Sequence, residues 1–255
     1  MQRGLLNRKK KQKYLRLKDF LIYCLLNIIR NLKMLKNFYL IISVLIASFC
    51  LAEKDDKHIF SDIYKNDTWC GGSGSGSVPK NAMPYLELLQ KFFNDKRFNT
   101  IVDLGCGDWQ LMERIIIPRK KSYMGYDVVQ EVIDANNKRF AKPNVQFITI
   151  NSLQEIEHVR ADLLIVKDVL AHWPNSRVQY FLTKILPNYK YALITHDVTD
   201  DFGKEDMKNS DIKLGSHRPI DITLEPFNLK NTTVVLKYNS LGYDKISFFY
   251  ENPIW

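Results

Sequence analysis

The chain has 255 residues, 45% of them hydrophobic, which is enough to build one large core rather than two. The formal net charge of +9 is concentrated at one end: residues 1–52 carry eleven Lys or Arg and one acid, whereas the rest of the chain carries 26 basic and 27 acidic side chains. The neutral body argues against a domain that coats nucleic acid through a basic surface, so no specific nucleic-acid partner is expected.

Residues 1–59 are expected to form a basic arm ahead of a folded domain at residues 60–255. The arm holds a basic cluster, NRKKKQKYLRLK, at residues 7–18 and an apolar run of 15 residues at Phe38–Ala52. Read from Met34, the basic start, the apolar run and the small residues before acids have the layout of a secretory signal peptide. Because a bilayer span needs ~20 residues, a signal peptide, a marginal membrane anchor, an amphipathic surface helix and a core helix all stay open.

Basic residues beside an apolar helix bind anionic lipid, so an anionic membrane surface is the expected partner of residues 1–52. We therefore expect a membrane-associated or exported protein, with a cytoplasmic one as the alternative. The true start is either Met1 or Met34.

The glycine-rich stretch Gly71–Ser77 predicts a loop, and the apolar spacing of Pro84–Phe93 predicts a helix. The four cysteines show no CxxC pairing and no spacing typical of a metal site, so no metal is expected.

From Thr100 onward, apolar runs of strand length alternate with segments of helical spacing, which predicts a parallel sheet covered by helices on both faces. Near the end of the chain, two runs separated by NSLGYD predict an antiparallel pair at one edge of the sheet. The fold class is therefore α/β with seven strands, mostly parallel. The predicted strands are residues 100–104, 122–127, 145–150, 162–168, 191–197, 232–238 and 245–251. The predicted helices between them are residues 109–117, 130–140, 152–159 and 176–186.

Polar groups follow each of the five parallel strands. In an open α/β sheet the ligand lies beyond the carboxyl ends of the strands, so these groups are candidate site residues, with helix caps and solvated turns as the alternative reading. They are Asp103 with Gly105 and Gly107, then Asp127, Asn151, Asp168 with His172, and His196 with Asp197.

The corner after the first strand, Asp103-Leu-Gly-Cys-Gly-Asp-Trp, lets the chain turn tightly beside a ligand. An NAD site would require a third glycine where this chain has Gln110, and an acid before the first glycine suits a positively charged ligand rather than a diphosphate. Asp127, 24 residues after Asp103, is placed to accept hydrogen bonds from ribose hydroxyls. The two acids together indicate a nucleoside with a cationic tail, which is S-adenosylmethionine (SAM).

The motifs VDLGCGDW, GYDVV and VKDVLAHW, with Asn151, resemble those of class I SAM-dependent methyltransferases over Phe60–Trp255. The segments WCGGSGSGS, KDVLAHW and GSHRPIDITLEPF are similar to those of a bacterial and algal subgroup of these enzymes. The resemblance implies a seven-stranded Rossmann-like sheet with SAM as cofactor, and it departs from the family at Trp109, which replaces a glycine, and at Asn151, which replaces an acid. The implied cofactor-binding residues are Asp103, Gly105 and Gly107 for the methionine part, Asp127 for the ribose, Asn151 and Ser152 for the adenine edge, and Asp168.

Asp168 and His172 are the candidate catalytic pair, because their spacing lets the carboxylate orient the imidazole as a general base. The alternative for His172 is a packing residue beside Trp173. The glycine-rich loop is expected to close over the carboxylate of SAM through backbone N–H groups, although its composition also suits a flexible linker. The candidate substrate or lid residues are Trp69, Ser75, Gly76, Ser77, His196, His217 and Arg218.

The methyl acceptor is not identified by the sequence. No NPPY-like segment follows the fourth strand, and the insertion before the sixth strand is short, which favours a small molecule or an exposed side chain as acceptor. Two alternatives stay open: a SAM-binding protein without transferase activity, and an NAD-dependent oxidoreductase, which Gln110 disfavours. An exported chain would also have to meet a cofactor that is made in the cytosol.

Overall fold

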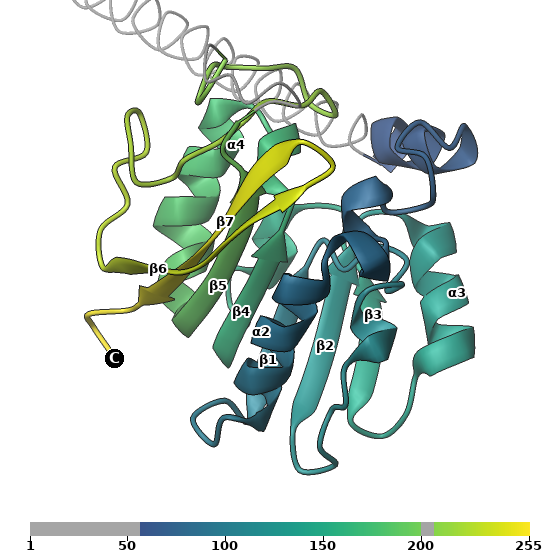
Figure 1. The fold of residues 1–255 in the computed structure, drawn as a ribbon. Helices are drawn as coiled ribbons and strands as arrows, with labels where there is room; N and C mark the ends of the chain where they lie inside the picture. Colours follow the sequence, from purple (N-terminus) through teal and green to yellow (C-terminus); the bar gives the residue numbers. More distant parts are fainter. Residues whose placement is uncertain (1–56, 200–206) are drawn as a thin grey trace, which may run out of the picture. The chain divides into compact units, whose positions relative to one another are not determined.

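The computed structural model describes residues 57–199 and 207–255, which are built around one seven-stranded sheet (Figure 1). The strand order is β3-β2-β1-β4-β5-β7-β6. Neighbouring strands among the first five pair in parallel, whereas β7 runs antiparallel to both β5 and β6. The predicted α/β class, with seven strands and an antiparallel edge, is therefore confirmed. The strands are β1 (Thr100–Leu104), β2 (Ser122–Asp127), β3 (Val145–Thr149), β4 (Ala161–Lys167), β5 (Tyr189–Asp197), β6 (Thr232–Ser240) and β7 (Tyr243–Glu251).

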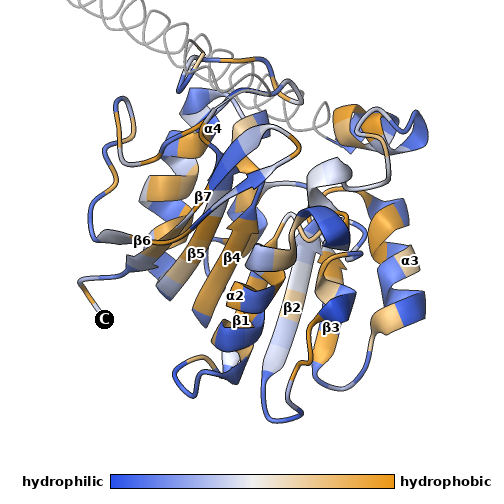
Figure 2. Ribbon diagram, in the orientation of Figure 1, coloured by the Kyte–Doolittle hydropathy of each residue, from blue (hydrophilic) through white to orange (hydrophobic). Residues whose placement is uncertain are grey.

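The core lies on both faces of the sheet, because side chains of a strand alternate between its two faces. On β4, Leu164 and Val166 enter one cluster of buried residues, and Leu163 and Ile165 enter the other. Strands β4 and β5 are hydrophobic over most of their length for this reason (Figure 2).

Helices cover both faces, as predicted. Helix α2 packs against one cluster through Leu89 and Phe93, and α4 packs against the other through Val178. The helices are α2 (Met83–Asn94), α3 (Gln130–Phe140) and α4 (Asn175–Tyr180), the last continued by a π-helical turn at Phe181–Ile185; residues 57–65 are helical as well.

Two predicted helices are wrong. Residues 109–117 contain only a 3-10 turn at Met112–Arg114, and residues 152–159 contain only one at Leu153–Ile156. The first departure follows from Trp109, which adopts a φ of 62° that no right-handed helix allows. This conformation places its indole in the core between the rings of Phe140 and Phe147, at centroid distances of 4.9 and 5.3 Å.

The described part of the chain begins with a helical segment, residues 57–65. Glu53–Trp255 form one compact unit, and the side chain of Phe60 is buried in its core. The expected boundary at residue 60 falls within this helical segment and stays a prediction. The predicted basic cluster and apolar run of the arm lie outside the described residues. Within residues 57–199 and 207–255, no helix combines the length and the apolar character that a membrane span requires.

Candidate functional site

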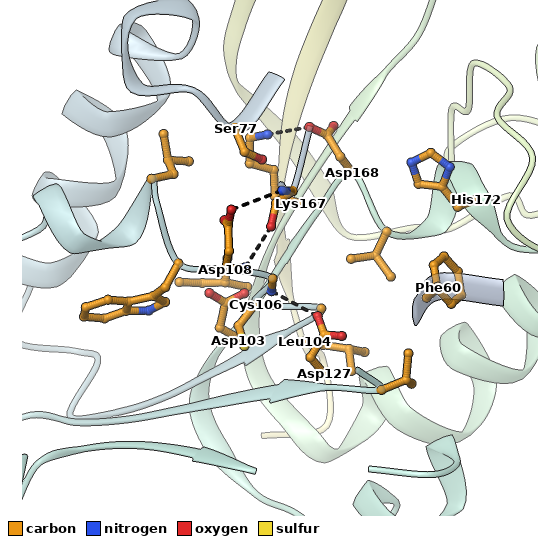
Figure 3. Close-up of a pocket in the computed structure, with 18 of the residues that line it drawn as sticks. Phe60, Ser77, Asp103, Leu104, Cys106, Asp108, Asp127, Lys167, Asp168 and His172 are labelled. Atoms are coloured by element: carbon orange, nitrogen blue, oxygen red, sulfur yellow. Dashed lines mark hydrogen bonds and ion pairs between the residues drawn. The ribbon is translucent and has the colours of Figure 1, made fainter. Parts of the chain in front are cut away.

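A cavity of about 150 Å³ lies at the carboxyl ends of the parallel strands β1, β2 and β4. Figure 3 shows the side chains of Asp103, Asp127, Asp168 and His172 around it. The sequence therefore predicted residues that the fold brings to one place, although they are spread over a hundred positions of the chain. The predicted residues that line the cavity are Trp69, Ser77, Asp103, Gly105, Gly107, Asp127, Ser152, Asp168 and His172.

Asp103, at the end of β1, is a nearly buried carboxyl group. Its Oδ2 accepts a hydrogen bond of 2.6 Å from the hydroxyl of Tyr123, which in turn accepts one of 2.8 Å from Nε1 of Trp109. Burial raises the pKa of Asp103 to about 7, and the bond from Tyr123 opposes this shift only in part. An acid with this pKa loses its proton readily when a cation binds beside it.

Asp127, at the end of β2, is also buried, and burial raises its pKa. Backbone N–H groups of Val129, Gly107 and Val128 oppose this shift. Gly107 donates to Oδ2 at 3.0 Å, and Val129 donates to Oδ1 at 3.1 Å. Each carboxylate oxygen still has a lone pair for a ligand hydroxyl. Asn136 of α3 donates to the carbonyl of Gly107 at 2.7 Å, so the glycine turn after β1 is held from both sides.

The glycine-rich loop is docked on this turn. Ser73 donates from its backbone to Oδ2 of Asp108 at 3.2 Å, and its Oγ accepts from the backbone N–H of Asp108 at 2.8 Å. Gln110 donates from Nε2 to the carbonyl of Gly71 at 2.9 Å. The residue that replaces the third glycine of an NAD site thus holds the loop.

Glycine suits this contact because Gly72 and Gly107 adopt left-handed φ values of 68° and 55°, and side-chain atoms of the facing segment occupy the place of a Cβ atom. A Cβ atom on Gly72 would lie 2.0 Å from Oδ2 of Asp108, and one on Gly107 would lie 2.1 Å from Oγ of Ser73. At its other end the loop accepts a hydrogen bond of 3.1 Å from Nζ of Lys167 to the carbonyl of Gly76. The loop therefore bridges the ends of β1 and β4 in the manner of a lid.

Asp168, directly after β4, is paired with two lysines. Its Oδ2 pairs with Lys167, and its Oδ1 lies 2.9 Å from Nζ of Lys245, which also lies 2.6 Å from Oδ1 of Asp197. Burial alone would raise the pKa of Asp168, but the two ammonium groups outweigh it and hold that pKa well below its ordinary value. Both oxygens of this carboxylate are therefore engaged away from His172.

The predicted contact between Asp168 and His172 is corrected by the structure. Nδ1 of His172 lies 2.9 Å from the backbone carbonyl of Ser216, and its ring packs against Trp69 with the centroids 4.8 Å apart. A carbonyl can only accept, so Nδ1 of the neutral ring carries the hydrogen and Nε2 carries the lone pair. Desolvation, followed by the neighbouring charge of His217, lowers the pKa of His172 to about 4, so the ring is neutral at pH 7.

Seven predicted residues lie outside the cavity lining: Ser75, Gly76, Asn151, His196, Asp197, His217 and Arg218. Asn151 is exposed and donates from its amide to Glu155 at 3.1 Å, which leaves Ser152 as the predicted adenine-side residue that lines the cavity. His196 is fully buried, its pKa is lowered to about 3 by burial, and neither ring nitrogen has a hydrogen-bond partner among the described residues.

The other two predicted lid residues belong to the loop before β6. Nε2 of His217 lies 3.3 Å from Oδ2 of Asp197 at a partly exposed position. Arg218 is fully buried and donates five hydrogen bonds to other described residues, so it is placed to hold the loop.

Several polar residues that line the cavity were not predicted from the sequence, among them Lys167, Tyr64 and Tyr85. The sequence could have indicated Lys167 as a site residue, because it is a charged residue inside an otherwise apolar strand run. The sequence gives no such indication for Tyr64 and Tyr85, because an aromatic residue at helical spacing is usually a core residue. The hydroxyl of Tyr85 is buried without a hydrogen-bond partner in the described part of the chain, which leaves it available to a ligand.

No group of three His, Cys, Asp or Glu side chains within residues 57–199 and 207–255 is arranged to hold a metal ion.

No protein-family model matches the sequence, and no curated protein matches it.

Solved structures share the fold. The methyltransferase domain of bacterial CtHen1 is 14% identical over 67% of this chain and 99% of that domain, with a TM-score of 0.51. The N-methyltransferase NodS from Bradyrhizobium japonicum WM9, in complex with S-adenosyl-L-homocysteine, is 13% identical over 69% of this chain and 89% of that one, also with a TM-score of 0.51. The predicted class I methyltransferase sheet is thus confirmed as the fold of this chain.

Proposed function

We propose that this chain, which has the class I methyltransferase fold, binds SAM and transfers its methyl group to a small molecule or an exposed side chain. One observation carries the proposal: two buried acids, Asp103 and Asp127, flank a glycine turn in a single cavity. An acid with a pKa near 7 suits an ammonium group, and a carboxylate with free lone pairs suits a pair of ribose hydroxyls. The complex of NodS with S-adenosyl-L-homocysteine supports the same class of ligand.

Residues that follow different strands would bind different parts of SAM. Asp103 would hold the amino group of the methionine part, and the open turn at Gly105 and Gly107 would let that part approach the backbone. Asp127 would hold the ribose, and Ser152 would lie at the adenine edge. SAM supplies an electrophilic methyl group, so the protein has to align the acceptor and keep water out of the site.

His172 is the candidate base on the acceptor side. Its neutral ring offers the lone pair of Nε2, and its Nδ1–H is held by the carbonyl of Ser216. A proton from an acceptor hydroxyl or amine would move to Nε2. The loop at residues 71–77 would exclude water by bridging the strand ends. A base in this position favours a transferase over a protein that only binds SAM.

An NAD-dependent oxidoreductase is the weaker alternative. A diphosphate is normally bound at the N-terminus of the helix that follows the glycine turn. Here the turn leads to Trp109 at a φ of 62° and then only to the 3-10 turn Met112–Arg114. Melting temperatures measured with NAD and with SAM would distinguish the two, because a ligand stabilises the protein that binds it.

Calorimetry on residues 53–255 is expected to show binding of both SAM and S-adenosyl-L-homocysteine. The truncated chain keeps the whole compact unit, including Phe60, Tyr64 and Trp69, which line the cavity. The full chain should bind with the same affinity, because every proposed cofactor contact lies within this unit. A folded protein that gives no binding heat with either ligand would show that the cofactor is wrong.

The affinity for S-adenosyl-L-homocysteine is expected to rise with pH and to level off above about pH 7. Burial raises the pKa of Asp103 to about 7, so below that pH the acid must lose a proton before it can pair with the ligand's ammonium group. The affinity should therefore fall by up to about tenfold for each pH unit below the pKa. Calorimetry across this range measures the effect.

Asp103→Asn is the matched control for the pH series, since the amide has the same shape and does not titrate. It should bind more weakly and show little change in this range. A wild-type affinity that does not change with pH would remove Asp103 from the ammonium site.

A further inference from the structure

The loop before β6 caps the turn that carries His172. The four backbone carbonyls of residues 170–173 each accept a hydrogen bond from this loop, which the structure describes from Met207 onward. Gly215 donates from its backbone to His172 at 2.9 Å, and Arg218 donates to the other three. The donors of Arg218 are its backbone N–H to Ala171 at 3.2 Å, its Nη1 to Leu170 at 2.9 Å and its Nη2 to Trp173 at 3.1 Å.

Arg218 is fully buried and is tied to both segments. Beyond the carbonyls of the turn, its Nε donates to the carbonyl of Ser210 at 2.9 Å, and its Nη2 donates to Oδ1 of Asn175 at 2.8 Å. Burial lowers its pKa to about 10, so the guanidinium is still charged at neutral pH. A buried charge is costly unless its donors are satisfied, and a planar fork of five N–H groups suits carbonyls that lie in different directions.

The same loop also orients the imidazole. The carbonyl that fixes Nδ1 of His172 belongs to Ser216, two residues before Arg218. The position of the ring and the direction of its lone pair thus depend on contacts of one short segment, residues 215–218. Asp168, the residue expected from the sequence to orient the ring, pairs with Lys167 and Lys245 instead.

We propose that Arg218 is a positioning residue, which fixes the turn at Leu170–Trp173 so that His172 presents Nε2 to the methyl acceptor. The role given to His172 rests on the proposed methyltransferase function, whereas the geometry that Arg218 imposes does not. Displacing a reacting group by about 1 Å can lower a rate by about 10²-fold, so a residue that contacts no ligand can still control turnover.

The test is nitrogen NMR of the full chain labelled at histidine, with Arg218→Lys as the variant. In the wild type, one ring nitrogen of His172 should give the chemical shift of a protonated nitrogen and the other that of an unprotonated nitrogen. The pKa of this ring should be about 4. Lysine keeps the charge but cannot cap carbonyls in several directions. The variant should therefore lose the single tautomer, and the pKa of His172 should move up toward the ordinary value of 6.5. Its affinity for S-adenosyl-L-homocysteine should change by less than about twofold, because the proposed ligand contacts lie on other strands.

Controls separate positioning from stability. Lys213→Ala changes an exposed residue of the same loop and should leave the signals of His172 unchanged. If Arg218→Lys does not fold, Asn175→Ala removes one acceptor of the guanidinium and should produce a smaller shift in the same direction. A folded Arg218→Lys variant with a lower melting temperature but wild-type signals for His172 would overturn the proposal. Absence of S-adenosyl-L-homocysteine binding by the wild type would instead contradict the proposed function, with the imidazole signals still measurable.

Discussion

His172→Ala is expected to lower turnover by about 10²–10⁴-fold, the range of general-base assistance. The reason is the loss of Nε2, whose lone pair the Ser216 carbonyl directs by holding Nδ1. The lowered pKa of about 4 makes His172 a weak base, which places the expected loss toward the lower end of this range. Turnover is measured as methyl transfer from labelled SAM to pooled small-molecule and peptide acceptors.

The competing role of His172 is packing, because its ring lies against Trp69. A packing role predicts that thermal stability and turnover fall together, whereas a base predicts lost turnover with an unchanged affinity for S-adenosyl-L-homocysteine. His158→Ala is the matched control, since it removes an exposed histidine. Unchanged turnover of His172→Ala on an acceptor that the wild type methylates would end the general-base role.

Asp127→Ala is expected to weaken cofactor binding by about 10- to 150-fold, as measured by calorimetry. Losing charge-assisted hydrogen bonds to a ligand costs roughly 1.5–3 kcal/mol, which corresponds to this factor. Asp127→Asn should weaken binding less, because one acceptor oxygen remains. Equal affinities of the wild type and Asp127→Ala would show that this carboxylate does not contact the ligand.

Asp127 also has a role within the protein that the test has to account for. The alanine leaves the N–H groups of Gly107 and Val129 without their acceptor, so the variant should melt at a lower temperature than the wild type. Affinities are therefore compared well below both melting temperatures. Asp134→Ala, an exposed acid on α3, is the control that should change neither quantity.

The sheet was predictable because strand periodicity is local. Residues such as Leu163 and Leu164 of β4 alternate between two buried faces, and that pattern is visible in a few consecutive letters. The strand-end acids were predictable for a related reason, since parallel strands bring their carboxyl ends to one edge. Both inferences needed only the order of residues within short segments.

The parts that could not be predicted depend on contacts between distant segments. Trp109 breaks the expected helix because Tyr123, Phe140 and Phe147 provide a buried place for its indole. His172 is oriented by a backbone carbonyl 44 residues away. Every residue has such a carbonyl, so the sequence does not indicate which one makes this contact.

The docked glycine-rich loop also has a consequence for the rate at which ligands exchange. Three hydrogen bonds, formed by Ser73 with Asp108 and by Gln110 with Gly71, join it to the turn after β1. At about 1 kcal/mol each, these three bonds and the one from Lys167 to the carbonyl of Gly76 would leave the undocked loop a population of about 0.1%. Entry and departure of a nucleoside would then both wait for this minor state, which lengthens the residence time of the demethylated product.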